Sequence, residues 1–252
     1  VRELHGKLMD QARASHFSDP GEFRKSQNWL GGTRPDNARF VPPPVEEMNR
    51  ALSDLERFIH ANDSTLTLIK AALIHAQFET IHPFLDGNGR VGRLLITYYL
   101  FWKGILSKPL LYLSLYLKRN QQEYYGLLMK IRTEGDWESW VKFFLTGIAE
   151  TSDEAAKTAK AIIMLKEKII ATLCQKSYAS SGAIRMIDII FNAPIIDANE
   201  CVKRLKISQV SANQLLNRFE EIGVLKEITG KKRYKKYLFK EFVSLMAKGT
   251  EQ

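Results

Sequence analysis

The sequence contains few cysteines and no long apolar run, and each absence excludes a class of protein. Two cysteines, Cys174 and Cys201, are too few for a disulfide framework and lack the spacing of a metal site. No stretch of about eighteen apolar residues and no signal peptide is found, so we expect no membrane span and a cytoplasmic location. The GxxxxGK[ST] pattern of P-loop proteins is also absent.

The 252 residues suffice for one large domain, or for one domain and a small module. Hydrophobic residues make up 45% and charged residues 26%, which is typical of a soluble globular protein. Because the chain begins with Val1 rather than methionine, we expect further sequence upstream. The net charge of +9 is uneven: residues 203–240 hold eleven basic and three acidic side chains, a net +8. This basic segment indicates a surface of interest without naming a partner.

Apolar residues recur every three or four positions through most of the first 176 residues, which predicts a mainly α-helical fold. The segment VEEMNRALSDLERFIH, 45–60, shows this spacing most clearly. Pro83 predicts that a helix ends at His82, since the residue before proline avoids the α region. Further helices are expected at about 90–102, 120–132, 137–149 and 152–176.

Two segments interrupt this helical pattern. Residues 23–44 contain Gly-Gly, Pro-Asp and three consecutive prolines, which predicts an irregular loop or a small hairpin. Residues 177–183 are small and polar, as in a linker. The remainder, 184–252, reads as three short helices followed by two β-prone runs around Gly-Lys-Lys, the order of a winged helix-turn-helix. Ser208 is placed to cap the third helix.

The segment HPFLDGNGRVGR, 82–93, has the composition of a polyphosphate site. Glycines at the start of a helix form a nest for anions, and two arginines three residues apart, Arg90 and Arg93, can grip phosphate oxygens. Asp86 is a carboxylate for a phosphate-bound Mg²⁺, and His82 is suited to accepting a proton. The alternative is a simple turn, since Asp-Gly and Asn-Gly are common turn signals. An EF-hand fails because Thr97 stands where glutamate is required.

This segment matches the HxFx[D/E]GNGRxxR motif and thereby resembles the Fic family, enzymes that transfer AMP from ATP to protein hydroxyls. Flanking segments such as KAALIHAQFETIHPF and EGDWESWVKFFL also resemble sequences of this family. The resemblance implies a Fic-type helical core over 1–176, a linker over 177–183 and a winged helix over 184–252. His82 would be the general base, Phe84 a buried anchor, and Asp86 the Mg²⁺ ligand. The nucleotide-binding residues would be Asp86, Gly87, Asn88, Gly89, Arg90, Val91, Gly92 and Arg93.

Two further sets of residues follow from the resemblance. A flap, a small β-hairpin over about 27–41, would pair with the target through Asn37, Ala38, Arg39, Phe40 and Val41. Simple packing is the alternative for Phe40 and Val41. Tyr124 and Tyr125 would line the adenine side, with core packing as the alternative. In all, we expect an adenylyltransferase using ATP and Mg²⁺ and acting on a Ser, Thr or Tyr hydroxyl of a protein, including this one.

Many Fic enzymes carry an inhibitory motif, [S/T]xxxE[G/N], whose glutamate pairs with the arginine equivalent to Arg93. The only glutamate here followed by Gly or Asn is Glu134, and Lys130 stands four residues before it. The inhibitory motif is therefore absent. We expect the inhibitory helix upstream of Val1 and Arg93 free in this chain.

The C-terminal segment predicts a second partner, DNA, through the third helix and a basic wing. The candidate residues are Asn213, Asn217, Arg218, Lys231, Lys232 and Arg233. A protein-interaction or dimerisation role is the alternative, so a homodimer stays open. The rival to an enzyme is a DNA-binding regulator whose Fic core senses a nucleotide. UMP or GMP transfer also stays open.

Overall fold

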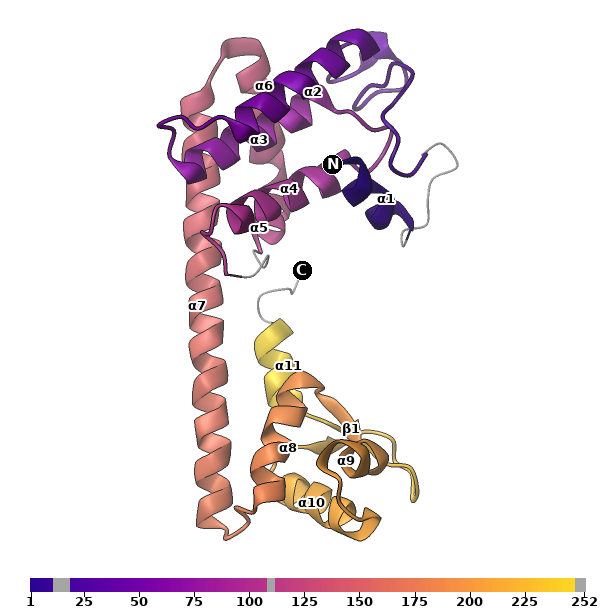
Figure 1. Cartoon of the computed structure of the whole chain (residues 1–252), viewed down its shortest axis with the longest axis vertical. Helices are drawn as coiled ribbons and strands as arrows, with labels where there is room; N and C mark the ends of the chain where they lie inside the picture. Colours follow the sequence, from indigo (N-terminus) through magenta and orange to yellow (C-terminus); the bar gives the residue numbers. More distant parts are fainter. Residues whose placement is uncertain (11–18, 108–111, 248–252) are drawn as a thin grey trace. The chain divides into compact units, whose positions relative to one another are not determined.

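A computed structural model of the chain describes residues 1–10, 19–107 and 112–247. It divides into two compact units, Val1–Ser152 and Asp153–Gln252. The first holds α1 (Arg2–Asp10), the 3₁₀ helix η1 (Pro35–Asn37), α2 (Val45–His60), α3 (Thr67–Ile81), α4 (Asn88–Trp102), α5 (Leu113–Arg119), α6 (Gln121–Glu134) and the start of α7 (Trp137–Gln175) (Figure 1). Among the described residues, no helix combines the length and the apolarity that a membrane crossing requires.

The first unit is a bundle of helices around one apolar core. The antiparallel neighbours α3 and α4 lie against each other, and α2 and α6 pack on α3. Trp140 of α7 is fully buried in this core, and its indole nitrogen donates to the Ala72 carbonyl of α3 at 3.0 Å. The core thus fixes the ends of α3 and α4, the two helices that the 82–93 segment joins.

The second unit contains the end of α7, then α8 (Ser181–Asn192), β1 (Ile195–Asp197), α9 (Ala198–Leu205), α10 (Gln209–Glu221), β2 (Lys226–Glu227), β3 (Lys236–Leu238) and α11 (Lys240–Ala247). Its strands form an antiparallel sheet in the order β1-β3-β2, with Ile196 opposite Tyr237 and Glu227 opposite Tyr237. The three predicted helices are confirmed, and Ser208 caps α10 by accepting a hydrogen bond from the Ser211 amide at 3.2 Å. The expected pair of strands is part of a three-stranded sheet, because β1 also pairs with β3.

The mainly helical class is confirmed, and three details differ from expectation. The helices predicted at 137–149 and 152–176 are one helix, α7, because no proline or glycine lies between Ile148 and Ser152 to end it. The second part of α7 packs with the C-terminal elements through Leu165, Ile169 and Leu173. The helices α1, α5 and α11 were not predicted.

The third difference is the expected hairpin over 27–41. Its described residues form a single antiparallel bridge, Leu30 opposite Phe40, with η1 between the two. The Leu30 amide donates to the Phe40 carbonyl at 2.8 Å, and the Arg39 and Phe40 amides donate back to Leu30. Prolines at 35 and 42–44 lack the amide hydrogen that a longer ladder needs. We call residues 27–41 the flap loop.

Candidate active site

The 82–93 segment is the connection from α3 to α4 together with the start of α4. His82 directly follows α3 in the left-handed conformation, with φ 49° and ψ 61°, and its amide donates to the Phe78 carbonyl at 3.0 Å. Pro83 prevents the helix from continuing, which confirms the predicted end. Gly87 precedes α4 with φ 80°, and a Cβ there would lie 3.1 Å from Met9 Sδ. Conformation and close approach both require glycine at this position.

The loop is held from inside by Asn88 and Phe84. The Asn88 side chain accepts from the Phe84 amide at 2.9 Å and donates to the Phe84 carbonyl at 2.7 Å. Asn28, in the flap loop, donates to the same carbonyl at 3.1 Å. The Phe84 ring is fully buried and stacks on His5 of α1, with ring centroids 3.8 Å apart. Phe84 is therefore an anchor as expected, and the Asn88 side chain is occupied in holding the loop.

The start of α4 offers unpaired backbone donors. Because α4 begins at Asn88, the amides of Asn88, Gly89 and Arg90 have no carbonyl partner within the helix. These amides and the helix dipole together favour a bound anion such as phosphate. The side chain of Val91 is fully buried in the core, so Val91 supports the site from beneath.

His82 is held as a neutral imidazole. Burial, together with the positive charges of Arg132 and Arg24, lowers the pKa of His82 to about 4. Its Nδ1 is buried and has no hydrogen-bond partner among the described residues. A neutral imidazole at pH 7 is free to accept a proton, provided that a nearby negative charge then stabilises the imidazolium.

Asp86 is the one acidic side chain within the 82–93 segment. It is exposed, its Oδ1 accepts from the Gly87 amide at 2.6 Å, and its Oδ2 lies 3.4 Å from Arg90 Nη2. Among the described residues, no three His, Cys, Asp or Glu side chains form a metal cage. A single open carboxylate beside an anion site is the donor set that Mg²⁺ uses when phosphates and waters complete its coordination. The residues present therefore fit a nucleotide-bound Mg²⁺.

Arg93 shares its surroundings with a buried carboxylate, Glu79 of α3. A Cβ added at Gly89 would lie 3.2 Å from Arg93 Nη1 and 3.9 Å from Glu79 Oε1. Glu79 is 6% exposed, and its Oε1 has no hydrogen-bond partner among the described residues. Burial raises the pKa of Glu79 to about 7, against the opposing charges of Arg93 and Arg132. Arg93 and Glu79 thus both lie close to Gly89 at the start of α4, and the charge of Arg93 acts on the Glu79 carboxyl group.

Residues 1–100 match the sequence model of the Fic/DOC family. The Protein adenylyltransferase Fic of Drosophila erecta is 31% identical over 158 residues, which cover 61% of this chain and 28% of that protein. The protein of the same name from Drosophila melanogaster is 30% identical over the same lengths. Over residues 1–100 this chain is similar to the Fic/DOC family.

The solved structures agree on the fold. A Fic family protein from Desulfovibrio desulfuricans G20 superposes on 95% of this chain and on 68% of its own, with a TM-score of 0.53 and 21% identity. That likeness concerns the fold alone. The chain spans just over a quarter of the length of the curated relatives, 28% in each case described above.

The site also involves residues that the sequence did not identify as part of it. Arg24 is 2% exposed, and its guanidinium donates to the His82 carbonyl at 3.1 Å and to the Pro43 carbonyl. His5 of α1 lies 3.1 Å from the Asp86 carbonyl and accepts from the Gly21 amide at 2.8 Å. Arg24 and His5 are 58 and 81 residues from the groups they hold, so no local pattern connects them. A single arginine between Phe23 and Lys25 is a weak signal on its own.

The candidate target-binding residues of the flap loop differ in exposure and in their contacts. Phe40 is half-buried, whereas Val41 is exposed. The Asn37 side chain accepts from the Thr33 and Arg34 amides, both at 2.9 Å, so it shapes the tip of the loop. Ala38 and Arg39 follow η1, and Arg39 contributes its amide to the bridge.

The two tyrosines of α6 differ in environment. Tyr124 is 3% exposed, and its hydroxyl lies 2.9 Å from His75 Nε2 in the core. Tyr125 is 41% exposed. The geometry favours the packing alternative for Tyr124 and leaves Tyr125 with the surface that contact with a ligand requires.

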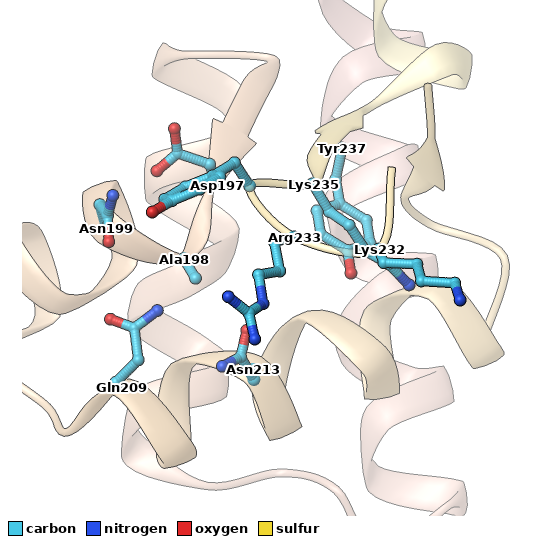
Figure 2. Close-up of a pocket in the computed structure, with 10 residues that line it drawn as sticks. Asp197, Ala198, Asn199, Gln209, Asn213, Lys232, Arg233, Lys235 and Tyr237 are labelled. Atoms are coloured by element: carbon cyan, nitrogen blue, oxygen red, sulfur yellow. The ribbon is translucent and has the colours of Figure 1, made fainter. Parts of the chain in front are cut away.

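In the second unit, the candidate DNA-binding residues separate into two groups. Asn213, Lys232 and Arg233 line one recess of about 360 Å³, together with Asp197, Ala198, Asn199, Gln209, Tyr234, Lys235 and Tyr237. In Figure 2 the Arg233 side chain points toward Asn213 of α10. Arg218 does not line the recess; its guanidinium lies 5.1 Å from the Tyr178 ring. Asn217 and Lys231 are exposed outside the lining.

Proposed function

We propose that the first unit transfers AMP from ATP to a Ser, Thr or Tyr hydroxyl of a protein, releasing pyrophosphate. The support comes from the names of the relatives and from one geometric observation. A half-buried, neutral imidazole, His82, and an anion-binding helix start, Gly87–Arg90, lie at the two ends of one loop held by Asn88. That arrangement supports the proposal, because the reaction needs a proton acceptor close to the bound polyphosphate.

In the proposed reaction, the target hydroxyl oxygen attacks the α-phosphorus of ATP and its proton passes to His82. The bond from the α-phosphorus to the oxygen bridging the α- and β-phosphates breaks, and pyrophosphate leaves. The free amides of α4 hold the phosphates, and Arg90 and Arg93 neutralise the charge of the leaving group. The negative charge of bound ATP raises the proton affinity of His82, whose pKa is low in the free protein.

Asp86 would hold Mg²⁺, which would neutralise part of the negative charge of the phosphates when bound. The protein's own contribution is positioning. Phe84 and Asn88 fix the loop from below, and Arg24 fixes the His82 carbonyl. Positioning and charge neutralisation are the main sources of catalysis in phosphoryl-type transfer.

The test uses ATP labelled at either the α- or the γ-phosphate, with the chain itself as acceptor. We expect protein-bound label from the α-phosphate only, and at least a hundredfold less in His82→Ala, on the order of a lost general base. His60→Ala is the matched control, since His60 is an exposed histidine at the end of α2. Label from the γ-phosphate would indicate phosphorylation instead. Equal label in wild type and His82→Ala would reject the enzyme. Labelled UTP and GTP test the choice of donor.

A second candidate function, DNA binding by the C-terminal unit as a winged helix, is favoured by the recess of Figure 2. Gln209 and Asn213 are one turn apart on α10, and both line the recess with Lys232, Arg233 and Lys235. Amide side chains can read adenine in the major groove, and basic side chains contact phosphates. One helix face and one basic loop therefore offer both kinds of contact.

Duplex DNA binding at several salt concentrations tests this function. Lys232→Ala with Arg233→Ala should reduce the slope of log affinity against log salt by about two. Lys166→Ala with Lys168→Ala removes the same charge outside the recess, from ion pairs with Asp188 and Glu241, and should leave the slope unchanged. Equal slopes in both double variants would reject the recess as the contact surface.

A further inference from the structure

Arg132, in the last turn of α6, contacts the end of α3 immediately before His82. Its Nε donates to Thr80 Oγ1 at 3.1 Å, and its Nη2 donates to the Glu79 carbonyl at 3.1 Å. The Thr80 hydroxyl in turn donates to the Ala76 carbonyl at 2.9 Å. A carbonyl in the last turn of a helix has no partner within the helix, and a positive charge is favoured at that end. Arg132 therefore fixes the turn from which His82 projects.

The same guanidinium also lies on the flap loop. Its central carbon is 3.7 Å from the centroid of the Phe40 ring, a cation–π contact. Phe40 is one partner of the single bridge, opposite Leu30, that closes this loop. One side chain thus touches both the segment expected to receive the target and the helix end that carries the proposed base.

The charges around Arg132 favour its staying in place. Burial lowers the pKa of Arg132 to about 10, so it remains protonated at neutral pH. The Glu79 carboxylate and the Tyr124 hydroxyl are the titratable groups that oppose this lowering. A buried guanidinium with two hydrogen bonds and an aromatic partner is costly to displace, because its charge would lose those contacts without regaining full solvation.

We propose that Arg132 is a positioning residue that couples the flap loop to His82, so that a segment paired with the flap presents its hydroxyl at the imidazole. The coupling is a property of the fold, whereas its consequence for transfer rests on the proposed function. It requires the planar fork of arginine, since a lysine ammonium cannot make two fixed hydrogen bonds and stack on Phe40 at once.

Hydrogen exchange tests the coupling without any activity. The Arg39 and Phe40 amides, bonded to Leu30, report on the flap loop, and the His82 amide, bonded to Phe78, reports on the end of α3. We expect Phe40→Leu to speed exchange of the His82 amide at least about threefold, although Phe40 does not contact it, because the stacking on Arg132 is lost. Arg132→Lys should speed exchange of both sets. Arg57→Lys, at an exposed arginine of α2, is the control. An unchanged His82 amide in Phe40→Leu overturns the coupling.

The pKa of His82, followed by NMR, distinguishes the effect of the Arg132 charge on His82 from the effect of the shape of the Arg132 side chain. Arg132 and Arg24 lower this pKa, whereas Asp86 and the hydrogen bond to the Glu79 backbone raise it. Arg132→Gln should therefore raise the pKa of His82, whereas Arg132→Lys should leave it near the wild-type value. A general loosening of the fold would move both variants alike and would overturn a direct effect of the Arg132 charge.

The functional consequence is measured as transfer of α-phosphate label to a His82→Ala copy of the chain. We expect Arg132→Lys to slow transfer about tenfold at saturating ATP while the Kd for ATP stays within about twofold, because the phosphate site on α4 is untouched. If wild type transfers label and Arg132→Lys matches it, the positioning role is overturned. If wild type transfers none while the exchange coupling holds, the proposed function fails and the coupling stands.

Discussion

Substitution of Asn88 by alanine should destabilise the first unit, because one side chain holds the loop by two buried hydrogen bonds. Asn88 Oδ1 accepts from the Phe84 amide at 2.9 Å, and Nδ2 donates to the Phe84 carbonyl at 2.7 Å. In Asn88→Ala the carbonyl keeps the bond from Asn28 at 3.1 Å, whereas the amide loses its described partner. The perturbation therefore leaves one buried donor unsatisfied and removes one further hydrogen bond.

The magnitude follows from these two losses. A buried unsatisfied amide costs about 1–3 kcal/mol, and an ordinary hydrogen bond contributes about 1 kcal/mol, so we expect roughly 2–4 kcal/mol in total. For a unit of this size, about 1 kcal/mol corresponds to about 2–4 °C in Tm, which gives roughly 5–15 °C. All four tryptophans, at positions 29, 102, 137 and 140, belong to the first unit. Thermal unfolding followed by tryptophan fluorescence therefore measures that unit.

Two variants serve as controls for this substitution. Asn49→Ala replaces an exposed asparagine of α2 and should leave Tm unchanged or slightly higher, since alanine is the better helix former. Asn88→Asp keeps an acceptor for the Phe84 amide but sets a carboxylate oxygen against the Phe84 carbonyl, so we expect it to be destabilising as well. A Tm for Asn88→Ala equal to that of Asn49→Ala would refute the reasoning that these bonds hold the loop.

Three further predictions concern packing, titration and thiol reactivity. Gly92→Ala should lower the free energy of unfolding by about 1–3 kcal/mol in denaturant titrations, because its Cβ would lie 2.5 Å from Glu79 Oε1 and 3.1 Å from Phe78. Gly126→Ala is the control, since there is open space around Gly126, and it should be neutral or stabilising. Equal effects of the two substitutions would contradict the packing argument. Burial raises the pKa of Glu79 from 4.5 to about 7, so the folded state holds this proton more tightly, and the resulting stability is complete below pH 4.5 and lost as pH rises through 7. Relative to Glu79→Gln, the unfolding free energy of the wild type should fall by about 3 kcal/mol across that range, and a constant difference would count against a buried acid. Cys174 is exposed, whereas Cys201 is buried and burial raises the pKa of its thiol to about 12. A thiol reagent should therefore label one cysteine in the native protein and two after unfolding. Two fast-reacting thiols in the native protein would disprove the burial of Cys201.

Local patterns predicted most of the helices. The apolar spacing of residues 45–60 predicted α2 with the bounds that the structure shows, and Pro83 predicted that α3 ends at His82. The capping residue Ser208 predicted the start of α10. Such features depend on residues within one or two turns, and the sequence displays them directly. The merging of two expected helices into α7 shows the limit, since a polar stretch without proline or glycine continues a helix as readily as it ends one.

Strand pairing was predicted less well than the helices. The flap loop was expected as a hairpin and is a single bridge, because its prolines and η1 occupy the residues that a ladder would use. The third strand, β1, was not expected, since three residues between two helices carry no pattern of their own. Its pairing with β3 depends on a partner about forty residues away in the sequence.

The sequence by itself determined the chemistry available at 82–93: a histidine at a helix end, a carboxylate in the loop, and glycines and arginines at the start of the next helix. Only the tertiary structure decided which distant groups hold that chemistry in place. Arg24 and His5 hydrogen-bond to carbonyls of the loop, and Arg132 hydrogen-bonds to the Glu79 carbonyl just before it, each from 53 or more residues away. Every residue has such a carbonyl, so these bonds leave no trace in residue type or spacing. The burial that lowers the pKa of His82 and raises that of Glu79 is likewise a property of the packed core, which no short segment contains.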